Sequence, residues 1–289
     1  MICAGTAFTL FSCQKVNSVN DEEMADKKKP RKDVCLISSF GYSNSAIPQQ
    51  TIFTNHYDLS GRSMEIEAGL FSGGSVFSNL KLSVKWVNGG VAFVDASAPQ
   101  DTILLASFNK KGRIDKIIAG NKPNPNFLPT SFEYDPRGLR AMYITLAGNT
   151  LTSYFNYDHK GNLISIEDAP SASVSVPGKV EYTYDANQKA NDQFYFDEPR
   201  GFSWNTFSLV QYLGLFPELQ PTSLRTSTKV MWGNNYQAYH MNIINQQLDG
   251  NGKLISYDVA SPGSNATISH YNINWSCNLT ENLFTQGNQ

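Results

Sequence analysis

Short runs that alternate apolar and polar residues, rich in Val, Ile, Thr, Tyr and Phe, follow one another along most of this chain. Runs of this kind, broken by Gly, Asn or Pro, are typical of β-strands with one buried face. They predict early strands over 34–40, 51–57, 64–68, 80–87, 91–94, 103–108 and 114–119. Hairpins are predicted up to residue 184, and further strands over 229–245, 254–259 and 268–275.

A seven-residue motif, the hairpin cassette, recurs among these runs. It consists of an aromatic or aliphatic residue, Asp or Asn, two variable residues, Gly, a polar residue and an aliphatic one. Copies begin at Tyr57, Phe108, Tyr134, Tyr157 and Leu248, and a degenerate copy without Gly begins at Tyr184. The three central copies are about 23 to 27 residues apart, which indicates a structural repeat.

The cassette has the chemistry of a β-hairpin turn. An Asp side chain accepts a backbone N–H two residues on, and Gly supplies the left-handed position of a type I turn with a bulge. We therefore expect Tyr134 opposite Leu139, Tyr157 opposite Leu163, Phe108 opposite Ile114 and Leu248 opposite Leu254. The aromatic residues then share one face, as a sugar-stacking platform or as ordinary core, and we favour core.

The segment 199–224 departs from the strand pattern. Its apolar residues are dense, and Pro217 and Pro221 close it. We predict one short helical insertion that covers a face of the sheet.

The cassettes, Cys35 and the run 213–219 together resemble two known groups. The cassette is similar to the YD repeats of Rhs-type proteins, and the chain from 33 to 260 resembles domain-of-unknown-function lipoproteins of Bacteroidetes that reuse such repeats. The resemblance implies a mainly β fold, a long twisted antiparallel meander in a single layer or partly rolled, with one helical insertion. It implies no known activity.

Composition narrows the class of protein. At 289 residues the chain has room for one large β domain or two small ones, and we expect a single domain over 33–289. The net charge of −2 gives no electrostatic case, for the chain as a whole, for a nucleic-acid or anionic-membrane partner. Charged residues make up only 17%, which suits an extracellular β protein with a polar, uncharged face.

The N-terminus is typical of a processed export signal. Residues 1–12 are uncharged and mostly apolar or small, and Cys13 follows Ser12 as in a bacterial lipobox. Phe11 and the missing basic start depart from that pattern, and a buried apolar strand is the alternative. We expect a signal over 1–13, a lipid on Cys13, a charged tether over 14–32, and an outer-membrane lipoprotein facing the periplasm or the cell surface.

Catalytic patterns are scarce. The four histidines form no short-spaced metal pair, and the sequence has no nucleophile elbow and no phosphate-binding Gly loop. Glu65 and Glu67, on one strand face, are the paired-acid candidate outside the tether and the insertion, and solvent exposure explains them. We expect no cofactor and no enzyme, with a hydrolase around His240 and Glu218 as the alternative.

Cys35 and Cys277 stand near the two ends of the domain. In an oxidising periplasm they pair only if the terminal strands meet, and we expect two separate thiols.

The favoured function is a non-catalytic envelope lipoprotein that binds a ligand or serves as a scaffold. Its partners would be the membrane, through the lipid anchor, and a glycan or an envelope protein. The candidate contacts are Phe202, Trp204 and Tyr212 in the helical insertion.

Overall fold

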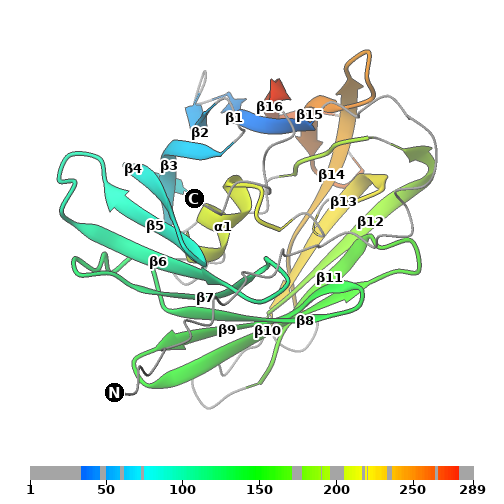
Figure 1. Cartoon of the computed structure of the whole chain (residues 1–289). Coiled ribbons are helices and arrows are strands. Elements are labelled where there is room, and N and C mark those ends of the chain that lie inside the picture. Colours follow the sequence, from blue (N-terminus) through cyan, green and yellow to red (C-terminus); the bar gives the residue numbers. More distant parts are fainter. Residues whose placement is uncertain are drawn as a thin grey trace, which may run out of the picture.

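The computed structural model describes residues 34–45, 50–58, 62–72, 75–170, 178–189, 191–195, 205–216, 219, 221–232, 236–263 and 266–279. Within these residues, sixteen strands form a closed antiparallel barrel around one short helix (Figure 1). The first eight strands are β1 (Val34–Asn44), β2 (Gln50–Tyr57), β3 (Ser63–Ser72), β4 (Ser75–Val87), β5 (Gly90–Asp95), β6 (Thr102–Phe108), β7 (Ile114–Ala119) and β8 (Thr130–Asp135). The rest are β9 (Gly138–Leu146), β10 (Asn149–Tyr157), β11 (Leu163–Asp168), β12 (Gly178–Lys189), β13 (Ser223–Trp232), β14 (Tyr236–Leu248), β15 (Leu254–Ala260) and β16 (Thr267–Leu279).

The ring closes between the first strand and the last. β1 pairs with β16 over nine residue pairs, among them Phe40 with Ile273 and Gly41 with Asn272. The expectation of an open or partly rolled meander is therefore wrong. Closure removes both sheet edges and brings the apolar faces of all strands into one interior, which a flat single layer would leave bare.

The hairpin cassettes form the predicted turns. In the β6–β7 turn, Asn109 Oδ1 accepts the backbone N–H of Lys111 at 2.9 Å and of Arg113 at 3.1 Å. Gly112 has φ +72°, the left-handed conformation the cassette needs. Asp158 and Asp249 accept equivalent N–H groups in the β10–β11 and β14–β15 turns. All four expected cross-strand pairs are present: Tyr134–Leu139, Tyr157–Leu163, Phe108–Ile114 and Leu248–Leu254.

The repeated aromatic face is core. Phe132, Phe155, Tyr157 and Tyr182 are each 6% exposed or less and point into the barrel. The interpretation of these residues as buried core is confirmed, and the sugar-stacking platform has no exposed rings at these four positions.

The barrel has two distinct rims because consecutive strands alternate in direction. The cassette turns connect β2–β3, β6–β7, β8–β9, β10–β11 and β14–β15, so they all lie at one rim, which we call the cassette rim. The same rim holds the start of β1 and the end of β16. The turns at 96–101 and 147–148 lie at the opposite rim.

The short helix lies within the predicted segment 199–224, but inside the ring rather than against an open sheet. It is α1 (Asn205–Tyr212), and β13 already begins at Ser223. Gly214, with φ +70°, ends the helix. Its N–H bonds the carbonyl of Gln211 and the next N–H, of Leu215, bonds that of Val210, the pattern of a Schellman cap. Every residue of α1 except Gln211 is buried, because the barrel wall surrounds the helix.

Candidate functional site

The lumen of the barrel is filled by the connection between β12 and β13. Its aromatic residues pack against opposite walls: Tyr212 stacks on Phe53 of β2 with ring centroids 4.3 Å apart, and Phe207 lies 5.8 Å from Phe155 of β10. Phe194, earlier in the same connection, meets Phe40 of β1 edge-on at 5.0 Å. The described part of this connection is therefore an apolar plug that packs against opposite walls of the barrel.

Hydrogen bonds fix α1 to the wall at both ends. Asn55 of β2 donates from Nδ2 to the carbonyl of Tyr212 at 2.7 Å, and its Oδ1 accepts the hydroxyl of Ser63 at 2.9 Å. At the other end, Thr206 Oγ1 lies 2.9 Å from the backbone N of Leu128 and 3.0 Å from its carbonyl oxygen. Both ends of the plug helix are thereby held by specific polar contacts as well as by packing.

One buried cation borders the plug. Arg225 of β13 is 3% exposed, and its guanidinium lies over the rings of Tyr182 at 4.1 Å and Tyr195 at 4.7 Å. Burial raises the pKa of Tyr195, whose hydroxyl accepts the backbone N–H of Arg225 at 3.0 Å. The cavity beside Arg225 measures about 30 Å³, enough for roughly two water molecules and too small for a sugar.

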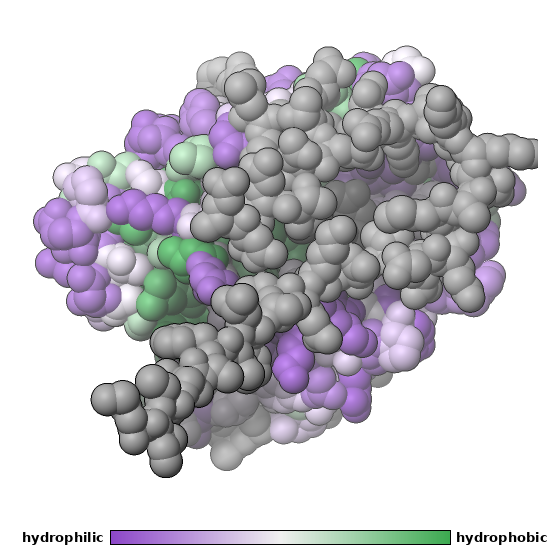
Figure 2. All heavy atoms as spheres, in the orientation of Figure 1, coloured by the Kyte–Doolittle hydropathy of each residue, from purple (hydrophilic) through white to green (hydrophobic). Residues whose placement is uncertain are grey.

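The outer face of the wall carries ion pairs. Lys81, in the middle of β4, bonds Glu65 at 2.8 Å and Glu67 at 3.3 Å, and Lys179 of β12 bonds Glu167 and Glu181 in the same way. Figure 2 shows hydrophilic side chains around the periphery and apolar ones on the inner side, near β4 to β6. The acid pair Glu65 and Glu67 therefore belongs to a surface ion-pair ladder.

A second polar cluster spans β14 to β16 on the outside. Asp258 Oδ1 lies 2.5 Å from His270 Nδ1, and Asp258 Oδ2 accepts Asn245 Nδ2 at 2.7 Å and Thr267 Oγ1 at 3.1 Å. Burial raises the pKa of Asp258, but the hydrogen bonds from Asn245, His270 and Thr267 outweigh it and hold the pKa below its usual value. Asn272 Oδ1 occupies the second nitrogen of His270 at 3.0 Å, so this His–Asp pair holds strands together and has no position open for a nucleophile.

Aromatic side chains at the cassette rim bond across the wall in a repeated way. Each donates to a backbone carbonyl on the preceding strand, at 2.7 to 3.0 Å; we call these contacts rim latches. They are Tyr57 to Ile37, Trp86 to Ser63, Tyr157 to Leu139, Tyr184 to Leu163 and Trp275 to Leu254. The cassette aromatic thus has a structural role that the repeat pattern alone did not reveal.

Two of the predicted functional residues, Tyr212 and His240, lie in the part of the chain that the structure describes. Cys13, Phe202, Trp204 and Glu218 lie outside the described residues. Tyr212 is 2% exposed, so the structure offers no surface there for the expected ligand contact. His240 of β14 lies opposite Lys229 of β13 in the barrel wall. Lys229 is one residue before Val230, whose buried side chain points into the barrel.

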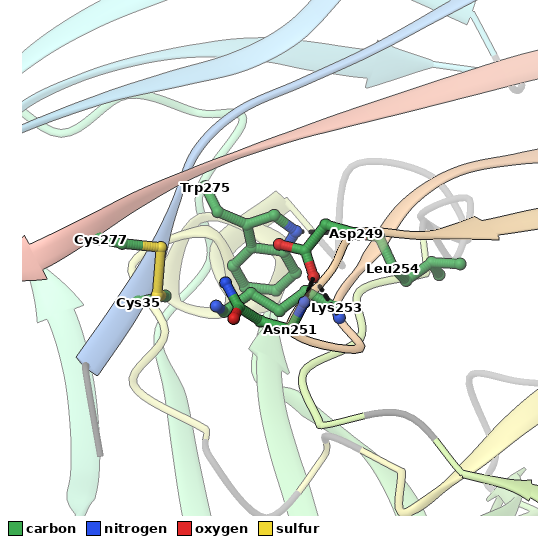
Figure 3. The surroundings of a disulfide bond; sticks show 7 residues. All are labelled: Cys35, Asp249, Asn251, Lys253, Leu254, Trp275 and Cys277. Atoms are coloured by element: carbon green, nitrogen blue, oxygen red, sulfur yellow. Dashed lines mark hydrogen bonds between the residues drawn. A yellow bond between two sulfur atoms is a disulfide. The ribbon is translucent and has the colours of Figure 1, made fainter. Parts of the chain in front are cut away.

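Cys35 and Cys277 form a disulfide across the closing seam, with Cα atoms 4.2 Å apart (Figure 3). The expectation of two separate thiols is wrong because the terminal strands meet. Figure 3 places Trp275 between this disulfide and the Asp249 turn, with the indole directed at the turn. The pairing condition stated from the sequence, that the sheet ends approach each other, is met.

In the part of the chain that the structure describes, no three His, Cys, Asp or Glu side chains are grouped so as to hold a metal ion. No helix in the same part is long and apolar enough to cross a membrane.

Comparison with known proteins finds a similar fold among solved structures. No protein-family model matches the chain, and no curated protein matches it significantly. Among solved structures, a porin-like protein from Bacteroides vulgatus superposes with a TM-score of 0.55 at 12% identity, covering 84% of this chain and 99% of its own. A porin-like protein from Bacteroides uniformis gives 0.51 at 12% identity, covering 83% and 97%. The chain shares the barrel fold of these two proteins.

Proposed function

We propose that the protein is a non-catalytic component of the outer membrane periphery, held there by a lipid on Cys13. In this proposal the barrel is a rigid, filled module that binds an envelope partner or serves as a scaffold. A glycan or an envelope protein is the expected partner.

The observation that carries the proposal is the polarity of the barrel wall. A membrane-spanning barrel has an apolar outer band about 25 Å tall and a polar interior. Here the polarity is reversed: Phe53 and Phe93 point inward and are 1% exposed or less, whereas Lys81 and Glu67 are 50% exposed on the outside. At the bilayer midplane a Lys such as Lys81 would cost about 2 to 4 kcal/mol, and a Glu such as Glu67 would cost less.

A transport pore is the second candidate, because the sixteen-strand closed barrel and the two porin-like neighbours favour it. The packed contacts of Tyr212 and Phe207 with the walls weigh against it. A liposome-swelling assay separates the two. We expect no sugar permeability from the purified full chain, and size-dependent swelling would overturn the proposal in favour of a pore.

The lipid anchor is tested by metabolic labelling with an alkyne-bearing fatty acid, followed by membrane fractionation. We expect label and outer-membrane recovery for the native chain, and loss of both in Cys13→Ser. Ser12→Ala is the matched control and keeps the label. An unlabelled native chain that fractionates as a free protein would refute the anchor.

A further inference from the structure

Exposed cations gather at the tips of the cassette turns. Lys110 and Lys111 lie in the β6–β7 turn, Arg137 in the β8–β9 turn and Lys160 in the β10–β11 turn, and all four are exposed. The carboxylates of the same turns sit behind these tips, bound to backbone N–H groups; Asp158 Oδ1, for example, accepts Lys160 N and Asn162 N at 2.8 Å each. Arg137 reaches back to Asp135 at 3.3 Å, whereas the lysines extend from the rim.

Exposed aliphatic side chains lie at the same rim, one of them in the hairpin of Lys160 and three in hairpins on either side of the cations. Met64, Val87, Ile164 and Leu248 are 50%, 52%, 39% and 39% exposed, and each is within two residues of a strand end at the cassette rim. A rim that carries both exposed Lys and large exposed aliphatic groups is amphipathic. Such surfaces bind the boundary between lipid headgroups and acyl chains.

The two rims differ in charge. At the opposite rim, Asp95 and Asp101 bracket the β5–β6 turn and Glu167 and Asp168 end β11, against Lys122 in the β7–β8 connection and Lys179 at the start of β12. The exposed lysines at the tips of the cassette turns therefore favour the approach of this rim to an anionic surface.

The chain also enters the barrel at the cassette rim, because β1 starts there at Val34. The sequence before it carries five basic residues between 27 and 32, and about 20 residues separate Cys13 from β1. An anchor on Cys13 would therefore keep this rim, rather than the other, close to the membrane.

We propose that the cassette rim is a membrane-docking surface for anionic phospholipid headgroups. Lys110, Lys111 and Lys160 contact the lipid phosphates. Val87, Ile164 and Leu248, at the same rim, enter the interface. The docking rests on the proposed anchor for its location in the cell. Its chemistry does not need the anchor, so the two can be tested apart.

The test uses the full chain with Cys13→Ser, so that no lipid contributes to binding. Co-sedimentation is measured with phosphatidylcholine vesicles that contain about one third phosphatidylglycerol, and with pure phosphatidylcholine vesicles. The rim variant is Lys110→Glu/Lys160→Glu. The matched control, with the same change in net charge away from the rim, is Lys122→Glu/Lys229→Glu.

We expect binding to the anionic vesicles only, a loss of at least about tenfold in the rim variant, and a change of less than about twofold in the control. Binding should also weaken as salt shortens the screening length. Equal behaviour of the two variants, or no binding by the Cys13→Ser chain, would overturn the docking surface. Fatty-acid labelling of the native chain reports the anchor separately, so failure of the rim does not count against it.

Discussion

Asn55 and Tyr212 are 157 residues apart in the chain, and the side-chain amide of the first donates to the backbone carbonyl of the second at 2.7 Å. The bond joins the barrel wall to the last residue of the plug helix. It satisfies a carbonyl that the end of α1 leaves without a helical partner, in a place that water does not reach.

Asn55→Ala should therefore destabilise the barrel by about 1 to 3 kcal/mol, the usual cost of leaving a buried polar group unsatisfied. Urea unfolding followed by tyrosine and tryptophan fluorescence measures the change. Thr54→Ala, on the outer side of the same strand, is the control and should change stability by less than about 0.5 kcal/mol. Equal effects of the two substitutions would show that the contact with α1 contributes nothing.

The rim latches predict that two tyrosine hydroxyls of β10 contribute differently to stability. Tyr157→Phe removes a hydroxyl that donates to the carbonyl of Leu139 at 3.0 Å, while the ring stays packed in the core. We expect a loss of about 0.5 to 1.5 kcal/mol in the free energy of unfolding. Tyr154→Phe, where the ring is 41% exposed, should be close to neutral. If Tyr157→Phe left the free energy of unfolding unchanged, the cassette tyrosine would stabilise the barrel by packing alone.

The cassette carboxylates predict that the stability of the barrel depends on pH. Burial raises the pKa of Asp158, but hydrogen bonds from Asn162 and Lys160 and the nearby His159 outweigh it, so the folded-state pKa lies below the usual value. Such a group adds stability above its unfolded pKa of about 4, and that contribution is lost as the pH falls through the lower folded value.

Asp158→Asn should keep the turn, because Asn109 forms the same contacts in the β6–β7 turn. We expect a cost of less than about 1 kcal/mol at pH 7, shrinking towards zero near pH 2.5. Asp158→Ala should cost stability at both pH values. Unfolding midpoints measured between pH 2.5 and pH 7 test this prediction. A difference in stability between the native chain and Asp158→Asn that stays constant with pH would contradict it.

Local structure was predictable because the cassette encodes it. Tyr134 and Leu139 face each other since the Asp and Gly between them fix the turn and its register, and no distant residue changes that geometry. The inward direction of Phe155 followed from the same alternation along the strand.

Closure was not predictable in the same way. It depends on the contact of Phe40 with Ile273, which are adjacent in the barrel but far apart in the sequence, and no turn motif links them. The position of α1 inside the ring depends on closure as well. Phe207 and Tyr212 fit a helix that covers one face of an open sheet as well as a plug inside a barrel. Only the curvature of the sheet distinguishes these two arrangements.

The buried polar contacts of the plug left no sequence signal. Arg225 follows an apolar residue in a segment without periodicity, and its cation–π partners Tyr182 and Tyr195 lie 43 and 30 residues earlier in the chain. The position of Trp275, in contrast, had a sequence signal. Trp275 stands two residues before Cys277, and an aromatic residue close to a strand end at the cassette rim recurs along the chain.

The seam between β1 and β16 gives the last prediction. The Cys35–Cys277 disulfide closes a loop of 242 residues and joins the two strands that complete the barrel. Because a cross-link restricts the unfolded chain most when its loop is long, Cys35→Ser/Cys277→Ser should cost about 2 to 4 kcal/mol. At this chain size the melting temperature should then fall by roughly 4 to 16 °C.

Thermal unfolding with and without a reductant measures this contribution. The native chain should lose stability on reduction, whereas the double variant should not respond, which separates the disulfide from general effects of the reductant. The variant should still fold, because the nine residue pairs of the seam and the core around Phe40 do not depend on the sulfur atoms. An unfolded double variant would instead mean that the seam closes only after the cysteines pair, and that barrel closure depends on oxidation.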